Sequence, residues 1–167
     1  MPTSRPNVQR GIRPEPYAPG EDLRGRNLRG ADLSGLCLSG VDLSHADLRE
    51  SNLSGTYFDG AILRWADCNG ANLEFAVLGG ADVTGACFAG ANLRRANLVG
   101  ATGHGADFTG ADLFYARPGN ADFQSASFRD ANITRAIFRR ANLTNSDFSG
   151  AMGEANFENA KMEGVRR

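Results

Sequence analysis

The chain has few of the residues on which catalytic and metal sites are usually built. It contains three cysteines and two histidines in 167 residues. An odd cysteine count without metal-type spacing argues against both a disulfide framework and a zinc site. There is no glycine-rich phosphate loop, and no Ser/His/Asp or Cys/His grouping converges in the sequence. We therefore expect no enzyme, no cofactor and no metal.

Charge and hydropathy show no extremes. The 18 Lys and Arg residues nearly balance 19 Asp and Glu residues, giving a formal net charge of −1. This balance gives no strong attraction to nucleic acid or to acidic membranes. No apolar run approaches the length of a transmembrane helix. The first residues contain no hydrophobic signal segment, so a cytoplasmic location is the default expectation.

Proline is nearly absent after residue 20. Five of the six prolines lie before that point. We predict a flexible, polyproline-like arm over residues 1–20, and the alternative is a cap that folds over the start of the domain. The remaining chain suits one domain over residues 21–164, followed by a short tail over 165–167.

The chain is rich in a five-residue repeat. From Leu23 to Phe148 every fifth residue is apolar, and only Gly103 and Pro118 interrupt the pattern. Residues 21–150 form 26 such pentads, of which 19 begin with Ala and 14 end with Gly. Self-similarity at a fixed period indicates a repeat architecture.

A period of five fits neither an α-helix nor a flat strand, because neither would collect the apolar residues on one face. The pattern works if the chain turns a corner in every pentad. The first and third residues then point inward, and the other three point outward. Gly at the fifth position suits a tight corner, and the frequent Asp or Asn at the second position is expected to bond the backbone there.

Individual pentads resemble the pentapeptide-repeat family, whose consensus is A(D/N)LXX. The strings ADLSG (31–35), ANLRR (91–95), ADFTG (106–110) and ANLTN (141–145) carry the resemblance, which extends over residues 21–164. It implies an all-β fold, a right-handed quadrilateral parallel β-helix with four pentads per coil and about 6.5–7 coils. We number the four faces from the pentads that begin at residues 21, 26, 31 and 36.

Residues twenty apart should stack in columns on this fold. On the third face the fifth positions alternate aromatic and cationic side chains at steps of about 4.8 Å, which suits cation–π contacts. Aromatic residues and arginine dominate binding hot spots, so we predict a partner-binding surface here. The alternative is that outward positions drift and the contacts only stabilise the rod. The candidate residues are Phe75, Arg94, Arg95, Phe114, Tyr115, Arg135 and, on the first face, Trp65.

Several further expectations concern irregular or charged regions. Gly103 and Pro118 should make the segments 101–105 and 116–120 bulge as loops with weaker packing. One residue is missing from the pentad at 151–154, where the phase slips. Aspartates on the first two faces should make that side acidic and the opposite side basic. They are Asp22, Asp42, Asp82 and Asp122 on the first face, and Asp47, Asp67, Asp107 and Asp147 on the second.

The end coils of such a rod expose unpaired backbone groups. One hypothesis is a homodimer through the C-terminal coil, with Phe157 and Met162 in or near the contact. A frayed last coil is the alternative.

The sequence favours a noncatalytic rod that binds another protein. The family resemblance also implies an alternative, a DNA mimic that binds DNA gyrase or topoisomerase IV and gives quinolone or toxin resistance in bacteria. Mimicry of a duplex needs dense negative charge, and the balanced composition lacks that excess. Neither function involves direct binding of nucleic acid or membrane.

Overall fold

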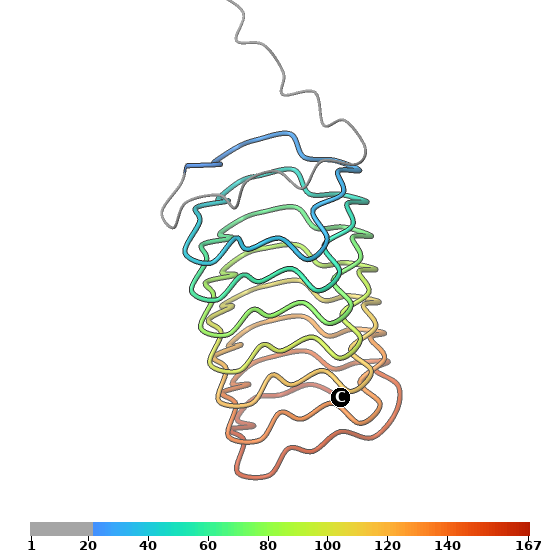
Figure 1. The fold of residues 1–167 in the computed structure, drawn as a ribbon. Helices are drawn as coiled ribbons and strands as arrows, with labels where there is room; N and C mark the ends of the chain where they lie inside the picture. Colours follow the sequence, from blue (N-terminus) through green and yellow to red (C-terminus); the bar gives the residue numbers. More distant parts are fainter. Residues whose placement is uncertain (1–21) are drawn as a thin grey trace, which may run out of the picture.

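The computed structural model describes residues 22–167, and the predicted proline-rich arm lies outside the described residues. The described backbone winds into a stack of similar coils (Figure 1). Single-residue parallel bridges join the coils, and residues 22–167 contain neither a helix nor an extended strand. Asp42, for example, pairs with Asp22 in the coil before it and with Ile62 in the coil after it.

The spacing of these bridges defines the coil. Asp22, Asn27, Asp32 and Cys37 each begin one column of bridges, and each pairs with the residue twenty positions later. Four pentads therefore complete one turn of the chain, as the sequence predicts. The columns of outward residues can be followed directly from this spacing.

Each pentad uses the same set of backbone hydrogen bonds between coils. The third residue donates its N–H to a carbonyl of the next coil, as Leu43 does to Ile62 at 2.7 Å. The second residue donates to a carbonyl of the previous coil, as Ile62 does to Val41 at 3.0 Å. These bonds satisfy polar groups that the narrow rod would otherwise leave unpaired.

The corners are closed by side chains at the second position. In pentad 41–45 the Oδ1 atom of Asp42 accepts the N–H of Ser44 at 2.9 Å. Asn72 does the same for Glu74 at 3.2 Å. The predicted role of the second-position Asp and Asn residues is confirmed, and it accounts for the fourth N–H of these pentads.

The interior is mostly apolar and contains the first and third residues of the pentads. Leu73, Leu93 and Leu113 are fully buried, as the geometry requires. Toward the C-terminus phenylalanine replaces leucine. On the second face the rings of Phe88, Phe108, Phe128 and Phe148 stack at successive centroid distances of 5.0, 4.9 and 4.6 Å.

The predicted loop at 101–105 is wrong. The N–H of Gly103 donates to the carbonyl of Asp122 at 2.8 Å, and Thr102 bridges to both neighbouring coils. A Cβ atom on Gly103 would lie 2.4 Å from the ring of Phe123. The aromatic ring of the next coil therefore occupies the space that the missing side chain leaves, and the backbone stays in register.

The predicted loop at 116–120 is also wrong, although the ladder is weaker there. Pro118 is buried and stays in phase, and Arg117 still bridges to Asn97. Because proline has no N–H, it donates nothing to the carbonyl of Ile137. The spacing of twenty predicts a bridge between Arg117 and Ile137 in the fourth-face column. Among residues 22–167 this bridge is missing.

The predicted slip near the C-terminus is confirmed. Asn132 pairs with Met152 at a spacing of twenty, but Ile137 pairs with Asn156 at a spacing of nineteen. Gly153 absorbs the missing residue with a φ of 87°, and a Cβ atom on it would lie 2.1 Å from Oγ1 of Thr134. Only glycine allows this approach of one coil to the other.

Candidate partner-binding surface

The corner column of the third face has the arrangement that the sequence predicts. The guanidinium carbon of Arg95 lies 5.3 Å from the centre of the Phe75 ring, and that of Arg135 lies 5.2 Å from the Tyr115 ring. Arg135 also donates a hydrogen bond to the Tyr115 hydroxyl. We call these four residues the corner ladder. The contacts hold long side chains in fixed positions along the rod.

A second row of side chains supports the corner ladder. Arg94 places its guanidinium carbon 4.3 Å from the centre of the Phe114 ring and makes a 3.0 Å ion pair with Asp112. The Phe114 ring meets the Tyr115 ring edge to face at a centroid distance of 4.6 Å. Side-chain contacts therefore join four of the seven predicted residues into one group, and Phe75 and Arg95 form a second pair that adjoins it through the chain neighbours Arg94 and Arg95.

The corner ladder stands on strained backbone. Its four residues have φ angles between 57° and 60°, in the left-handed region. A residue other than glycine costs about 1–2 kcal/mol in this conformation. The corresponding corner of the second face is mostly glycine, namely Gly30, Gly70, Gly90, Gly110 and Gly150. Large side chains on four successive coils at such a corner are therefore unusual within this rod.

Trp65 does not join the group. Its corner lies two pentads before that of Phe75, on the opposite side of a four-sided coil. The side chain is 60% exposed, and a Cβ atom on Gly85 would lie 2.2 Å from the indole ring. The ring therefore covers the bare backbone of Gly85, which gives it a packing role besides its exposure.

Phe157 and Met162 lie at inward positions of the last coil. The Phe157 ring stacks on Phe138 at a centroid distance of 5.2 Å, and the Arg167 guanidinium lies 5.4 Å from its centre. Met162 is half-buried against the same core. Both extend the hydrophobic interior, and a contact between two chains at this end stays a prediction.

The carboxylates of the first two faces are mostly paired with cations. Arg24 and Asp22 form an ion pair at 2.7 Å, and so do Arg49 and Asp47. The hydrogen bond from Arg49 lowers the pKa of the Asp47 carboxyl to about 2. Other aspartates of these faces within 4.0 Å of an arginine or histidine nitrogen are Asp42, Asp67, Asp82, Asp122 and Asp147.

These ion pairs reduce the net negative charge on the side that the sequence predicts to be acidic. Of the eight aspartates expected there, Asp107 alone has no arginine or histidine nitrogen within 4.0 Å among the residues that the structure describes. The opposite side keeps its positive charge. Arg95, Arg117, Arg135 and Arg140 have no carboxylate within 4.0 Å in residues 22–167.

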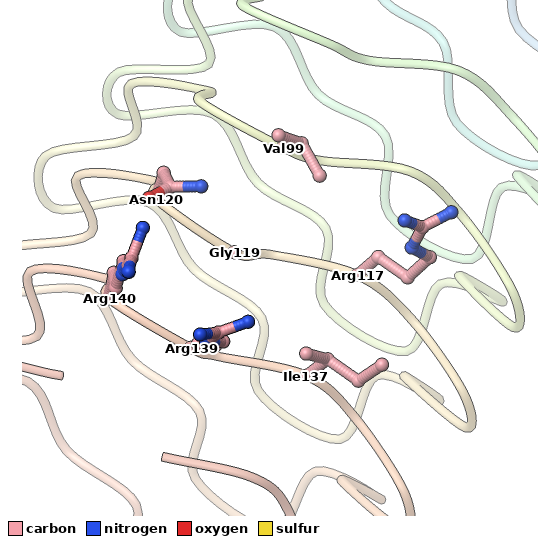
Figure 2. Close-up of a pocket in the computed structure, with 7 residues that line it drawn as sticks. All are labelled: Val99, Arg117, Gly119, Asn120, Ile137, Arg139 and Arg140. Atoms are coloured by element: carbon pink, nitrogen blue, oxygen red, sulfur yellow. The ribbon is translucent and has the colours of Figure 1, made fainter. Parts of the chain in front are cut away.

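Sequence reasoning missed a hollow on the fourth face beside Pro118 (Figure 2). Its volume is roughly 280 Å³. The signal in the sequence is Pro118-Gly119, where a proline occupies an inward position and a glycine the outward one that follows. The lining residues are Val99, Arg117, Gly119, Asn120, Ile137, Arg139 and Arg140.

Reactive groups are scattered over the described part of the rod. The three cysteines are free thiols, and burial raises the pKa of the Cys68 thiol. His104 contacts Asp122 at 3.0 Å. Among residues 22–167 no three His, Cys, Asp or Glu side chains converge in a way that could hold a metal ion. The described residues also contain no helix that is long and apolar enough to cross a bilayer.

Solved structures with the same architecture include a trypsin-treated variant of QnrB1, a plasmid-mediated fluoroquinolone resistance protein. It is 21% identical, with a TM-score of 0.60 over 88% of this chain and 86% of that one. HetL, a pentapeptide repeat protein involved in heterocyst differentiation regulation from Nostoc sp. strain PCC 7120, is 26% identical over 84% of this chain and 89% of its own, with a TM-score of 0.27.

A pentapeptide repeat protein from the Arabidopsis thaliana thylakoid lumen is 27% identical over 75% of this chain and 76% of its own, with a TM-score of 0.39. No curated protein sequence matches the chain. The profile described as "Pentapeptide repeats (8 copies)" matches residues 27–64, 66–102, 86–117 and 121–164. The chain therefore belongs to the pentapeptide-repeat family.

Proposed function

We propose that the chain is a noncatalytic rod of about 6.5–7 coils that binds a protein partner through the corner ladder. One observation carries the proposal. Four large side chains occupy left-handed corners on successive coils, where the second face of the same rod mostly uses glycine. Strained backbone of this kind clusters at functional sites, because its cost is retained only where the side chain has a use.

The chemistry of the corner ladder supports binding. Phe75 is 52% exposed, although it is a large apolar residue. Aromatic and arginine side chains are the groups that contribute most to protein interfaces. Their mutual contacts hold them in place before a partner arrives, which reduces the entropy lost on association.

The test is a pull-down from the native host with the wild type and the double variant Phe75→Ala/Tyr115→Ala. The matched control is Tyr57→Ala, because Tyr57 is an aromatic on the fourth face with 50% exposure, close to that of Phe75. We expect the double variant to lose one specific partner that the control retains. An unchanged set of partners would leave the corner ladder a purely structural feature.

DNA mimicry toward DNA gyrase or topoisomerase IV is a second candidate. It is favoured by the rod shape and by the fold shared with QnrB1. The paired carboxylates count against it, because a duplex presents unneutralised phosphates. A gyrase supercoiling assay at two salt concentrations discriminates the two. Inhibition or drug protection that fades with salt supports mimicry, and no effect at high protein excess leaves the interaction rod.

A further inference from the structure

The hollow on the fourth face lies next to the corner ladder. We propose that it binds a carboxylate or phosphate group carried by an acidic polypeptide segment. This inference rests on the proposed function, since it names the chemistry of the partner. We call Arg117, Arg139, Arg140 and Gly119 the arginine hollow.

The floor of the arginine hollow is bare backbone. Gly119 occupies a position whose side chain would point outward, yet the residue is buried beneath its neighbours. A Cβ atom there would meet nothing closer than the Arg139 carbonyl oxygen at 3.4 Å. In Figure 2 Gly119 lies between Arg117 on one side and Arg140 on the other, with Arg139 on the adjacent turn, and the Arg117 side chain extends away from the glycine. The volume of roughly 280 Å³ accommodates one small charged group.

The charge of the arginine hollow is largely uncompensated. Arg117 and Arg140 have no carboxylate within 4.0 Å among residues 22–167, and Arg139 makes one contact of 3.4 Å with Glu158. Guanidinium groups present planar forks of N–H donors that match the oxygens of carboxylate and phosphate. Three arginines in the lining of one hollow favour an oxyanion as its occupant.

A backbone acceptor in the same place distinguishes a polypeptide from other polyanions. The carbonyl of Asn97 accepts an N–H from Leu78 at 2.7 Å, and that of Asn156 accepts one from Phe138 at 2.8 Å. The equivalent donor for Ile137 would be residue 118, which is proline. Within residues 22–167 the Ile137 carbonyl oxygen therefore has no donor.

This carbonyl oxygen lies at the hollow, 3.7 Å from the position of a Cβ atom on Gly119. A peptide supplies an amide N–H beside an acidic side chain, whereas the backbone of a nucleic acid supplies phosphates and no amide. The combination of oxyanion donors and one free acceptor therefore favours an acidic peptide over nucleic acid.

The arginine hollow is continuous with the corner ladder. Arg117 follows Tyr115 by two residues, around the corner between the third and fourth faces. Arg95 and Arg135 occupy the same corner on the coils before and after it. One short segment of the partner can therefore contact both surfaces. Some of its residues pack on the aromatic rings, and an acidic residue a few positions away in the same segment enters the hollow.

The experiment measures binding of a fluorescein-labelled oligoglutamate peptide of about eight residues by fluorescence anisotropy. We expect Arg117→Gln/Arg140→Gln to weaken binding at least about tenfold, because charged hydrogen bonds are lost. The matched control is Arg129→Gln, which removes an exposed arginine of the second face. Gly119→Leu keeps every charge but fills the hollow, and we expect it to weaken binding by a similar factor.

A second readout locates the peptide. In NMR titrations the amide signals of Gly119 and Asn120 should shift with the peptide in the wild type. They should stay in place in Gly119→Leu. Circular dichroism and melting curves establish that each variant keeps the fold.

Several results would overturn the inference. One is equal weakening by Arg129→Gln, which would mean that binding follows general charge. Another is full binding by Gly119→Leu. Tighter binding of a short oligothymidylate than of the peptide would assign the surface to nucleic acid. Inorganic phosphate can also compete with the peptide. If the phosphate concentration that displaces half of the peptide is lower than the peptide concentration needed for half-maximal binding, the hollow is a site for a small free anion.

The outcomes also separate this inference from the proposed function. If Arg117→Gln/Arg140→Gln retains the partner that Phe75→Ala/Tyr115→Ala loses, the interaction rod stands and the acidic-peptide site fails. If the peptide binds in the hollow while Phe75→Ala/Tyr115→Ala loses no partner, the site stands and the role of the corner ladder fails.

Discussion

The N-terminal and C-terminal halves of the rod share one backbone but fill it differently. In the first half the inward third position is mostly leucine, and the exceptions are Phe58, Cys68 and Val83. From Phe88 onward phenylalanine predominates, and rings on the second face stack at centroid distances of 4.6–5.0 Å. This spacing matches the distance of about 4.8 Å between paired strands. The spacing of the stacked rings thus matches the coil repeat, and the same backbone contains both kinds of core.

The largest expected effect comes from removing a stacked ring. Phe128 contacts Phe108 and Phe148 above and below, at 4.9 and 4.6 Å. We expect Phe128→Ala to lower the free energy of unfolding by about 4 kcal/mol, and Leu48→Ala in the other half by about 3 kcal/mol. Urea unfolding followed by circular dichroism measures both. A larger loss at Leu48 would contradict the expectation that a stacked phenylalanine contributes more to stability than a core leucine.

Exchanging one core residue tests the difference between the leucine-filled half and the phenylalanine-filled half. Phe128→Leu gives the aromatic column the side chain of the first half, at a position that tolerates either shape. We expect a loss of about 1–1.5 kcal/mol, because the ring contacts on two sides disappear while an apolar side chain remains. The same unfolding experiment applies. A loss as large as that of Phe128→Ala would mean that leucine cannot fill the aromatic half.

Acid should destabilise the rod through its paired aspartates. The pKa of the Asp47 carboxyl is lowered to about 2 by Arg49, and that of Asp22 to about 2 by Arg24. Because the folded-state pKa lies below the unfolded value of about 3.9, the contribution is present above pH 4 and is lost as the pH falls toward 2. Melting temperatures measured from pH 6 to pH 2 should fall most steeply over the last two units.

Asp47→Asn separates the charge from the corner bond. The amide oxygen still accepts the N–H of residue 49, as Asn72 does for Glu74 at 3.2 Å. We expect a smaller fall of the melting temperature between pH 4 and pH 2 than in the wild type. An unchanged profile would show that Asp47 does not contribute to the acid sensitivity.

Restoring one backbone donor should stabilise the second half modestly. Pro118→Val returns an N–H opposite the Ile137 carbonyl and keeps a side chain of similar size. The expected gain is about 1 kcal/mol, the usual value of one hydrogen bond. The unfolding midpoint measures it, and a loss of stability would indicate that the proline ring is better packed than its missing bond suggests.

The smallest effect is expected at a corner. Tyr115→Gly removes the strain of a left-handed φ but also the contact with Arg135. Both terms are about 1 kcal/mol, so stability should change by less than about 0.5 kcal/mol. Partner capture should nevertheless be lost. A variant that keeps both stability and partner would show that Tyr115 is not needed for binding.

The five-residue period was enough to predict the columns, because the spacing of twenty follows from four pentads per coil. It placed Phe75 under Arg95 and Tyr115 under Arg135, and it identified the role of the second-position Asp and Asn. The period could not predict the fate of Gly103, because the ring that replaces its side chain belongs to Phe123, twenty residues later. It also treated Pro118 as a loop, although a proline costs this ladder a single donor.

Side-chain pairing was the other limit. The acidic surface inferred from Asp47 and Asp67 overlooked Arg49, whose guanidinium contacts both of these stacked carboxylates, at 2.7 and 3.6 Å. Such contacts depend on rotamers that a pattern of residue types does not specify. The arginine hollow was missed for a similar reason, because its residues come from two successive coils and its shape depends on their side chains.

The short pentad at Gly153 has a consequence for anyone who wishes to lengthen the rod. A cassette of twenty residues taken from the regular coils should splice into the regular region without disturbing its neighbours, since every junction repeats the same spacing. A turn that includes Gly153 closes in nineteen residues, as Ile137 and Asn156 show, so a cassette of twenty residues no longer fits there and would move later side chains out of their columns. The position of that glycine therefore marks where modular extension has to stop.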